Sequence, residues 1–350
     1  MSSKLKDSLQ AKLNQSLHFT GCMGVNVAIN DEKYGIWLGS SGFSDLDIKE
    51  ALNINSSFYI YSITKTFVSV CLLRLAQDAL LDLDDPLKKW LPEMPFPDSV
   101  TLRRLLNHTS GIPNYTSLED YLPAVSENPS IPWTHEKVAE LTCTGKLDFE
   151  PGEGWSYSNT GYMLLHEVTE AASGKTFAQA LEDNVFSVLD LQNTYVAHHV
   201  DTKGVLTPGY CRYLNCEGII ENVIPRYHPD WCATGLIAST AEEVVKFFDG
   251  IFSGKLLDAE QLEQMLTLLP TGTRDPWYKK PCYGLGIMAD PESRHGEKYG
   301  HGGGGPGYNL WAMHLPNFHG RKLTLALFCN TSISHAYEMV DDLLRVLEVA

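Results

Sequence analysis

The chain has 350 residues, 43% of them apolar and 20% charged, which is typical of an ordinary water-soluble globular protein. This length exceeds what one hydrophobic core usually organises, so we expect two lobes. With 27 basic and 43 acidic residues the formal charge is -16, which argues against nucleic acid or an anionic membrane as a partner.

The first predicted element is an amphipathic helix over residues 1–18, because its leucines recur at every fourth position. The segment has none of the continuous apolar core that a secretory signal needs. No stretch of the sequence reaches the length of a membrane span. We therefore expect a cytoplasmic protein that binds no membrane.

The later elements predict a sheet built from both ends of the chain, with a helical lobe inserted between them. Two strands forming a hairpin are expected at 22–30 and 34–39, and a helix from Ser62 to about Leu80. Further helices are expected at 100–106, 134–141, 161–172, 177–189, 241–252, 259–268 and 335–347, and further strands at 283–288, 310–315 and 323–329. We assign residues 1–60 and 235–350 to an α/β lobe and residues 61–234 to a mostly helical lobe.

A serine and a lysine lie three residues apart where an apolar, strand-like run becomes a helix. If Ser62 opens that helix, Lys65 lies on the same face, and its amine can reach the serine hydroxyl. The helix N-terminus adds N–H groups and partial positive charge where an oxyanion would develop. Ser3 and Lys6 show the same spacing, and Ser62 could simply cap a core helix, so the pair needs support from elsewhere.

A second candidate element is the turn-rich stretch that ends in Tyr157, Ser158 and Asn159. Residues two apart in extended backbone point the same way, so Tyr157 and Asn159 can face one site. A tyrosine near a lysine ammonium is a plausible proton carrier for a serine. The alternative is a core tyrosine beside a helix-capping asparagine.

The third element is a run of four glycines that begins one residue after His301. Glycines suit a place where backbone approaches a ligand closely, and no helix follows that would make a phosphate cradle. Gly303 and Gly304 could offer N–H groups to a substrate oxyanion, with His301 at the start of the strand. A flexible hairpin tip is the other interpretation.

Other chemistries have less support in the sequence. The histidines form none of the usual zinc-hydrolase patterns, and there is no G-x-S-x-G elbow or P-loop, so we expect no catalytic metal and no cofactor. The eight cysteines are expected to be buried thiols. Cys211, Cys216, His228 and Cys232 have spacings only loosely like those of a zinc site, and whether they do more than pack stays open.

In this order and at these intervals, the three elements resemble the S-x-x-K, Y-x-N and K/H-x-G motifs of the serine β-lactamase-like superfamily. That superfamily includes class C β-lactamases, DD-peptidases, D-amino-acid amidases and related esterases. The surrounding residues at 105–113, 151–162 and 235–240 are similar too, so the resemblance covers nearly the whole chain. It implies an α+β fold in which helices flank an antiparallel sheet, with the active site in the cleft beside the helical lobe.

The resemblance also implies a role for each motif residue. Ser62 would be the acylated nucleophile, and Lys65 and Tyr157 would share the proton transfers. Asn159 would hold the lysine and the substrate amide, and His301 would line the opposite wall. The backbone N–H groups of Ser62 and Gly304 would form the oxyanion hole, with Gly303 beside them in the third motif.

A histidine at position 301 favours substrates other than β-lactams, because a largely neutral imidazole attracts a carboxylate less well than a lysine does. We expect a serine hydrolase of small esters or amides, with D-amino-acid amides and short D-peptides as candidate substrates. A DD-carboxypeptidase or β-lactamase is the nearer alternative, and a catalytically silent binding protein is the alternative of another class. Tyr115, the region around Trp133 and the hairpin from Tyr210 are candidates to shape the substrate pocket, and the oligomeric state is open.

Overall fold

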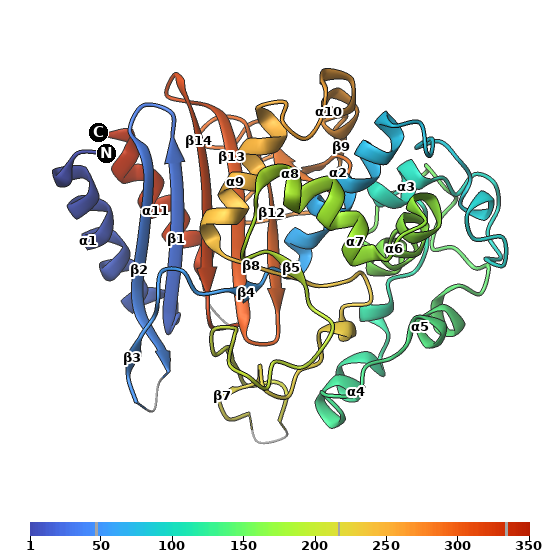
Figure 1. Ribbon diagram of the computed structural model, residues 1–350, viewed down its shortest axis with the longest axis horizontal. Helices are drawn as coiled ribbons and strands as arrows, with labels where there is room; N and C mark the ends of the chain where they lie inside the picture. The colour runs from blue at the N-terminus through green and yellow to red at the C-terminus, as the bar shows by residue number, and fades with distance from the viewer. Residues whose placement is uncertain (46–47, 216–217, 333–334) are drawn as a thin grey trace.

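A computed structural model describes residues 1–45, 48–215, 218–332 and 335–350. Figure 1 shows a sheet on one side of the molecule and a mainly helical part on the other, with both termini close together at the sheet's outer end. Among the described residues, none of the helices is both long enough and apolar enough to cross a bilayer.

The main sheet is antiparallel and joins the two ends of the chain. Its order is β3-β2-β1-β14-β13-β12-β11-β10-β9, so the first long strand pairs with the last, with Val25 opposite Cys329. The strands are β1 (Gly24–Asp31), β2 (Gly35–Asp45), β3 (Glu50–Ala51), β9 (Leu269–Pro270), β10 (Cys282–Tyr283), β11 (Met288–Asp290), β12 (Lys298–Gly305), β13 (Tyr308–Phe318) and β14 (Arg321–Cys329). This confirms the predicted fold class, including a sheet assembled from both termini.

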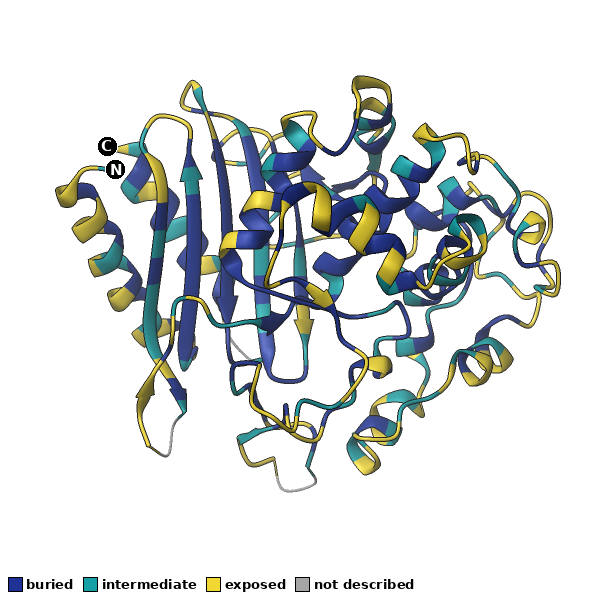
Figure 2. Cartoon of the chain, in the orientation of Figure 1, coloured by how far each residue is buried: buried dark blue, intermediate teal, exposed yellow. Residues whose placement is uncertain are grey.

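Alternation along the central strands supplies the two faces of this sheet with separate cores. Val25, Val27 and Ile29 of β1 pack with α1 (Ser3–Thr20) and α11 (Ala336–Glu348), whereas Ala28 points into the larger core on the opposite face. There α9 (Ala241–Phe252) contacts β1, β13 and β14. Figure 2 shows the resulting pattern, with the central strands buried and the outer surfaces of the covering helices exposed.

The helical part is organised around α2 (Thr64–Gln77), which is buried along most of its length. It contacts α6 (Asn159–Ser173), α7 (Phe177–Leu181) and α10 (Ala259–Met265). The remaining elements of this part are α3 (Leu102–Leu106), α4 (Tyr121–Glu127), α5 (His135–Thr142) and α8 (Ser187–Leu189), with the short turns η1 (Tyr61–Ile63), η2 (Leu87–Lys89), η3 (Tyr115–Ser117), η4 (Glu182–Phe186) and η5 (Pro229–Trp231). Small strands join it to the sheet side: β4 (Phe58–Tyr59), β8 (Ile237–Ser239) and β5 (Tyr195–Val196) form one sheet, and β6 (Tyr210–Cys211) pairs with β7 (Glu221–Asn222).

Most predicted elements are found within a few residues of their expected ends, but two of them differ from the structure. The expected strand 283–288 is broken by a turn at Gly286 (φ +70°), because the carbonyls of Leu285 and Gly286 accept hydrogen bonds from Ser69 and Thr66 of α2. The expected helix 177–189 contains a π-helical turn at Glu182–Phe186 between α7 and α8. The sequence did not predict η3 and α4, which lie between Tyr115 and Glu127.

Candidate active site

Ser62 lies in the middle of η1, the tight turn that joins β4 to α2. The preceding residue, Tyr61, has φ +44°, a left-handed conformation that a bulky non-glycine residue rarely adopts. Such strain persists only where the surroundings fix it, and here the Tyr61 hydroxyl donates to the Pro306 carbonyl over 2.5 Å. The serine therefore stands on a braced turn just before the helix, one helical turn ahead of Lys65.

The Lys65 ammonium brings the first two motifs together. Its Nζ lies 3.3 Å from Ser62 Oγ and 2.7 Å from Asn159 Oδ1, and the side chain is buried. It also lies 5.0 Å from the centre of the Tyr157 ring and 5.4 Å from that of Tyr162. The charge is thus held by a carbonyl oxygen, a hydroxyl and two aromatic faces, all of them uncharged.

Asn159 is oriented by two residues that the sequence analysis did not identify. Its Nδ2 donates to Asn114 Oδ1 over 3.2 Å and to Thr116 Oγ1 over 3.1 Å, which leaves Oδ1 for Lys65. Its backbone N–H also donates to Asn114 Oδ1. Both partners belong to the unpredicted segment around η3. The one clue to them in the sequence was their position just after residues 107–113, which carry part of the family resemblance.

The glycine run belongs to β12, which packs against the serine turn. A Cβ at Gly303 would lie 2.4 Å from the Ile60 carbonyl oxygen, and one at Gly305 would lie 2.2 Å from the Tyr61 ring. Gly304, between them, is exposed, and a Cβ there would meet no described atom within 4 Å. The run is therefore ordered strand, and Pro306 and Gly307 form the hairpin tip.

His301 is placed differently from the expectation that it lines the wall opposite Ser62. It is 1% exposed, and its Nδ1 lies 2.6 Å from the Gly302 carbonyl, so this nitrogen carries the proton. Its Nε2 therefore accepts from the Tyr283 hydroxyl over 3.0 Å. Burial, and then the charge of Lys65, lower the pKa of His301 to about 3 despite the hydrogen bond to Gly302. The imidazole is neutral and faces Tyr283.

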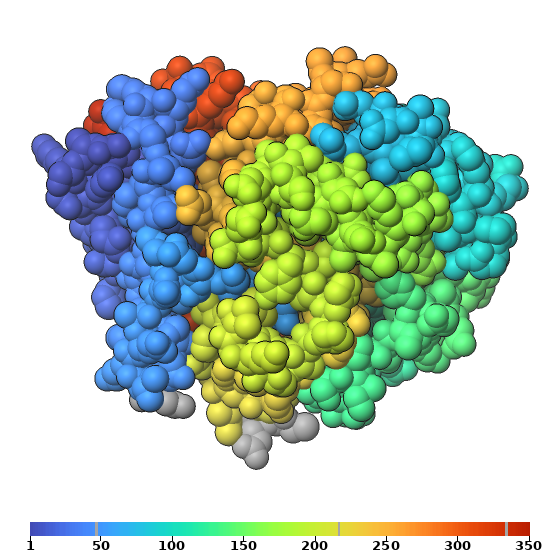
Figure 3. All heavy atoms as spheres, in the orientation of Figure 1, coloured from blue at the N-terminus to red at the C-terminus, as the bar shows by residue number. Residues whose placement is uncertain are grey.

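A cavity of about 400 Å³ opens at the serine, a size suited to a small ligand. It brings together Ser62, Lys65, Asn159, Gly304 and Tyr115, whereas Tyr157, His301 and Gly303 lie outside its lining. The other lining residues are Tyr61, Thr116, Tyr121, Leu122, Val125, Tyr213, Tyr227, Cys232, Thr234, Gly305 and Pro306. In Figure 3 the segment coloured lime to yellow, around residue 200, lies over the middle of the displayed face.

Tyr115 is a buried wall of this cavity. Its hydroxyl donates to the Trp231 carbonyl and accepts from the Ala233 N–H, both over 3.0 Å. With its hydroxyl held in this way, the residue shapes the cavity chiefly with its ring. Trp133 packs behind it through Tyr121 rather than lining the cavity.

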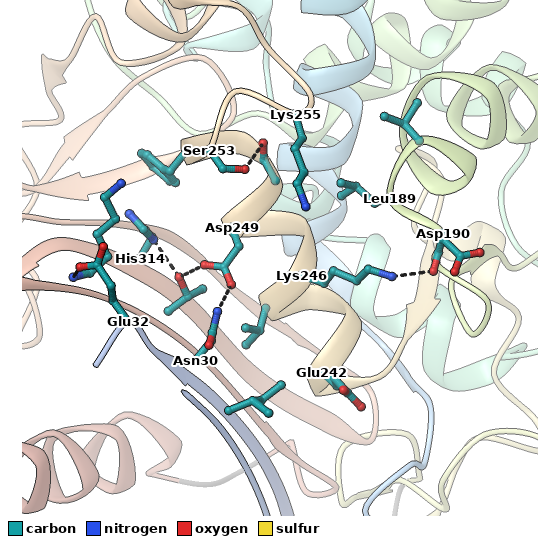
Figure 4. Close-up of a pocket in the computed structure, with 17 residues that line it drawn as sticks. Asn30, Glu32, Leu189, Asp190, Glu242, Lys246, Asp249, Ser253, Lys255 and His314 are labelled. Carbon is teal, nitrogen blue, oxygen red and sulfur yellow. Dashed lines mark hydrogen bonds between the residues drawn. The ribbon is translucent and has the colours of Figure 1, made fainter. Parts of the chain in front are cut away.

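A larger cavity, about 700 Å³, lies beside α9, away from the serine (Figure 4). Asp249 is held there by hydrogen bonds from Asn30 and Thr324, and burial raises the pKa of its carboxyl. Burial also lowers the pKa of His314 to about 4. None of the three motifs reaches this cavity. We therefore place the candidate active site in the smaller cavity, which Ser62 and Lys65 line.

The cysteine and histidine group has no metal-binding arrangement in the part of the chain that can be described. Cys216 lies outside the described residues. Among the described ones, no three His, Cys, Asp or Glu side chains are grouped to hold a metal ion. The sulfur of Cys232 instead lies 3.5 Å from the Tyr227 hydroxyl, at the wall of the serine cavity.

Known proteins with a similar sequence or fold cover most of the chain. The solved D-amino acid amidase from Ochrobactrum anthropi SV3 is 26% identical with a TM-score of 0.85, and the match covers 99% of both chains. A D-stereospecific amidohydrolase from Streptomyces sp. is 27% identical with a TM-score of 0.81, covering 95% of this chain and 97% of the other. Penicillin-binding protein 4* from Bacillus subtilis (strain 168) is 27% identical over 85% of this chain, which spans 66% of that relative's length.

A protein-family model described as Beta-lactamase matches residues 9–350, from the first helix to the last residue. All three motifs lie within that match. The chain therefore belongs to the beta-lactamase family of serine hydrolases.

Proposed function

We propose that the protein hydrolyses small esters or amides through an acyl-enzyme on Ser62. The observation that carries this proposal is the Lys65 Nζ, which links Ser62 Oγ and Asn159 Oδ1 at the edge of a cavity that Gly304 also lines. A nucleophile within reach of a base, itself oriented by a third group, is the arrangement that covalent catalysis requires.

The proposed reaction has two steps. Ser62 Oγ attacks the carbonyl carbon, and its proton passes by way of Lys65 and Tyr157 to the departing amine or alcohol. Water then attacks the acyl-serine, returns a proton to Ser62 Oγ and releases the carboxylic acid. The N–H groups of Ser62 and Gly304 would stabilise the oxyanion in both steps, as such donors do in acyl transfer.

The cavity favours substrates whose acyl part carries no carboxylate and is partly aromatic. Lys65 is the one charged side chain among the described residues that line it, and this ammonium is already engaged by Asn159. The neutral, buried His301 supplies no fixed charge for a substrate carboxylate. Similarity to a D-amino acid amidase and to a D-stereospecific amidohydrolase favours amides of D configuration, D-amino-acid amides among them, as a substrate class to test.

The proposal includes a cytoplasmic location. The seven described cysteines are free thiols, and six of them are buried, which suits a reducing compartment.

Intact-mass measurement after treatment with a fluorophosphonate tests the nucleophile. We expect one adduct on the native protein and none on Ser62→Ala. An unlabelled native protein, as the silent-binding alternative requires, or a labelled Ser62→Ala would refute the proposal. Turnover of p-nitrophenyl butyrate, a D-amino-acid amide, a D-alanyl-D-alanine peptide and nitrocefin would then separate an esterase or amidase from a DD-carboxypeptidase or β-lactamase.

A further inference from the structure

His108 lies behind the proton-transfer residues, outside the lining of the serine cavity. It follows α3 and has φ +64°, in the left-handed region where Asn, Asp and His are the non-glycine residues most often found. Its side chain is 1% exposed. Neither the proposed reaction nor the three motifs assign it a role.

His108 holds the loop that carries Tyr157 from both sides. Its carbonyl accepts the N–H of Ser156 over 3.1 Å, and its Nδ1 accepts the N–H of Ser158 over 3.1 Å. Between these two bonds lies Tyr157, whose ring centre is 4.3 Å from that of His108, with the rings tilted by 40°. One residue therefore contacts both the ring of Tyr157 and the backbone on either side of it.

The hydrogen bond to Ser158 determines which proton His108 carries. Since Nδ1 accepts, the neutral imidazole must be protonated at Nε2. Burial, and then the charge of Lys65, lower the pKa of His108 well below its ordinary value, so the ring stays neutral. Its Nε2 has no hydrogen-bond partner among the described residues. A buried N–H left without a partner destabilises the fold, so histidine at this position has a cost in stability.

Three requirements meet at this position, and histidine fulfils all of them. The backbone must adopt a left-handed conformation, an acceptor must reach the Ser158 N–H, and a flat ring must lie against Tyr157. Asparagine meets the first two, since its Oδ1 can take the place of Nδ1. Phenylalanine supplies the ring without the acceptor.

We propose that His108 is a positioning residue that holds the Tyr157 ring beside Lys65, so that the phenol is placed for proton transfer at Ser62. The proposal deepens the function argued above and rests on it. His108 touches neither substrate nor the reacting atoms. We expect it to affect the reaction only through Tyr157, so its effect on kcat should disappear once the Tyr157 hydroxyl is removed.

The test compares His108→Asn in two backgrounds, native and Tyr157→Phe. In the native background we expect kcat for an activated ester, counted per fluorophosphonate-labelled Ser62, to fall about tenfold or more, with KM nearly unchanged. In Tyr157→Phe the same substitution should change kcat by less than about twofold, because the group it positions is already gone. Counting labelled sites removes the contribution of unfolded protein.

A matched control is His314→Asn, which replaces another buried neutral histidine, one that lines the α9 cavity (Figure 4) and not the serine cavity. It should lower stability but leave kcat per labelled site unchanged. Equal losses for His108→Asn in both backgrounds, or full kcat in the native background, would overturn the proposal. His108→Gln substitutes if the asparagine variant does not fold. If neither variant gives labelled protein, His108 is needed for folding and the proposal fails. If native protein is unlabelled, the function itself is wrong.

Discussion

At the scale of single residues, the candidate site is notable for how its one charge is held. Lys65 is buried, and no carboxylate is among its contacts with the described residues. The hydrogen bond from its Nζ to Asn159 Oδ1, at 2.7 Å, is the shortest of these contacts. An amide can turn over and present Nδ2 instead, which would repel the ammonium. The hydrogen bonds from Nδ2 to Asn114 and Thr116 oppose that turn.

This orientation predicts the effect of a small substitution. Thr116→Val keeps the shape of the side chain but removes the acceptor for Asn159 Nδ2, so we expect kcat to fall about two- to tenfold, as for the loss of one neutral hydrogen bond. Thr116→Ser retains the hydroxyl and should keep nearly native kcat. Steady-state kinetics on an activated ester checks both variants. Equal activity of Val and Ser at this position would show that the hydrogen bond does not orient Asn159.

At the scale of elements, the site depends on how closely β12 approaches η1. Glycines at alternate positions of β12, Gly303 and Gly305, leave no room for a side chain against Ile60 and Tyr61. Gly304 points the other way, toward the serine cavity. The strand thus brings its backbone to the cavity that Ser62 lines, because side chains are missing on the face that meets the turn.

Gly303→Ala should therefore damage both stability and activity. The new methyl would meet a backbone oxygen, which cannot rotate away, and such overpacking costs about 1–3 kcal/mol. We expect a lower urea midpoint and a slower reaction with fluorophosphonate. Gly304→Ala, which points into open space, should unfold at the native midpoint. If Gly303→Ala keeps the native midpoint and labelling rate, the contact between β12 and η1 is looser than described.

The same elements show what the sequence could predict. Ser62 and Lys65 lie one helical turn apart, so their spacing predicted that the two side chains would meet, as they do at 3.3 Å. Ser3 and Lys6 share that spacing, so the choice of Ser62 depended on the other two motifs. The hydrogen-bond partners of Asn159, and His108 beside Tyr157, come from the segment at 108–116. They could not be predicted, because a contact between separate segments leaves no periodic pattern in the sequence. The orientation of the His301 side chain toward Tyr283 of β10 also depends on the strand order, in which β12 pairs with β11 and lies near β10. The sequence did not specify this order.

At the scale of the whole molecule, neutral histidines are buried in both halves. Burial lowers the pKa of His301 and of His166 to about 3, and the pKa of His314 to about 4, while His166 stacks on Phe177 at 3.9 Å between ring centres. In an unfolded chain an imidazole takes up its proton near pH 6.5. Unfolding therefore exposes several imidazoles, which then bind protons at mildly acidic pH.

The sign of the resulting pH dependence follows directly. Between pH 6.5 and about 3 the unfolded chain binds more protons at these histidines than the folded protein does, so the free energy of unfolding increases with pH. The histidine contribution is complete above pH 6.5 and is lost progressively as the pH falls. Lowered carboxyl pKa values act in the same direction, as at Asp341, where burial opposes but the hydrogen bond and charge of His295 prevail. We expect the urea midpoint to be nearly constant from pH 8 to 7 and to fall steadily from pH 6 to 4.

His166→Phe separates the histidine contribution from that of the carboxylates. Phenylalanine keeps a ring to stack on Phe177 and removes a buried Nδ1 that has no hydrogen-bond partner among the described residues. The variant should therefore be at least as stable as the native protein at pH 7, and its midpoint should fall less steeply between pH 6 and 4. His18→Asn, at an exposed position on α1, should reproduce the native slope. An unchanged slope in His166→Phe would mean that this histidine has no measurable share in the acid limit, although unfolding exposes it to protonation.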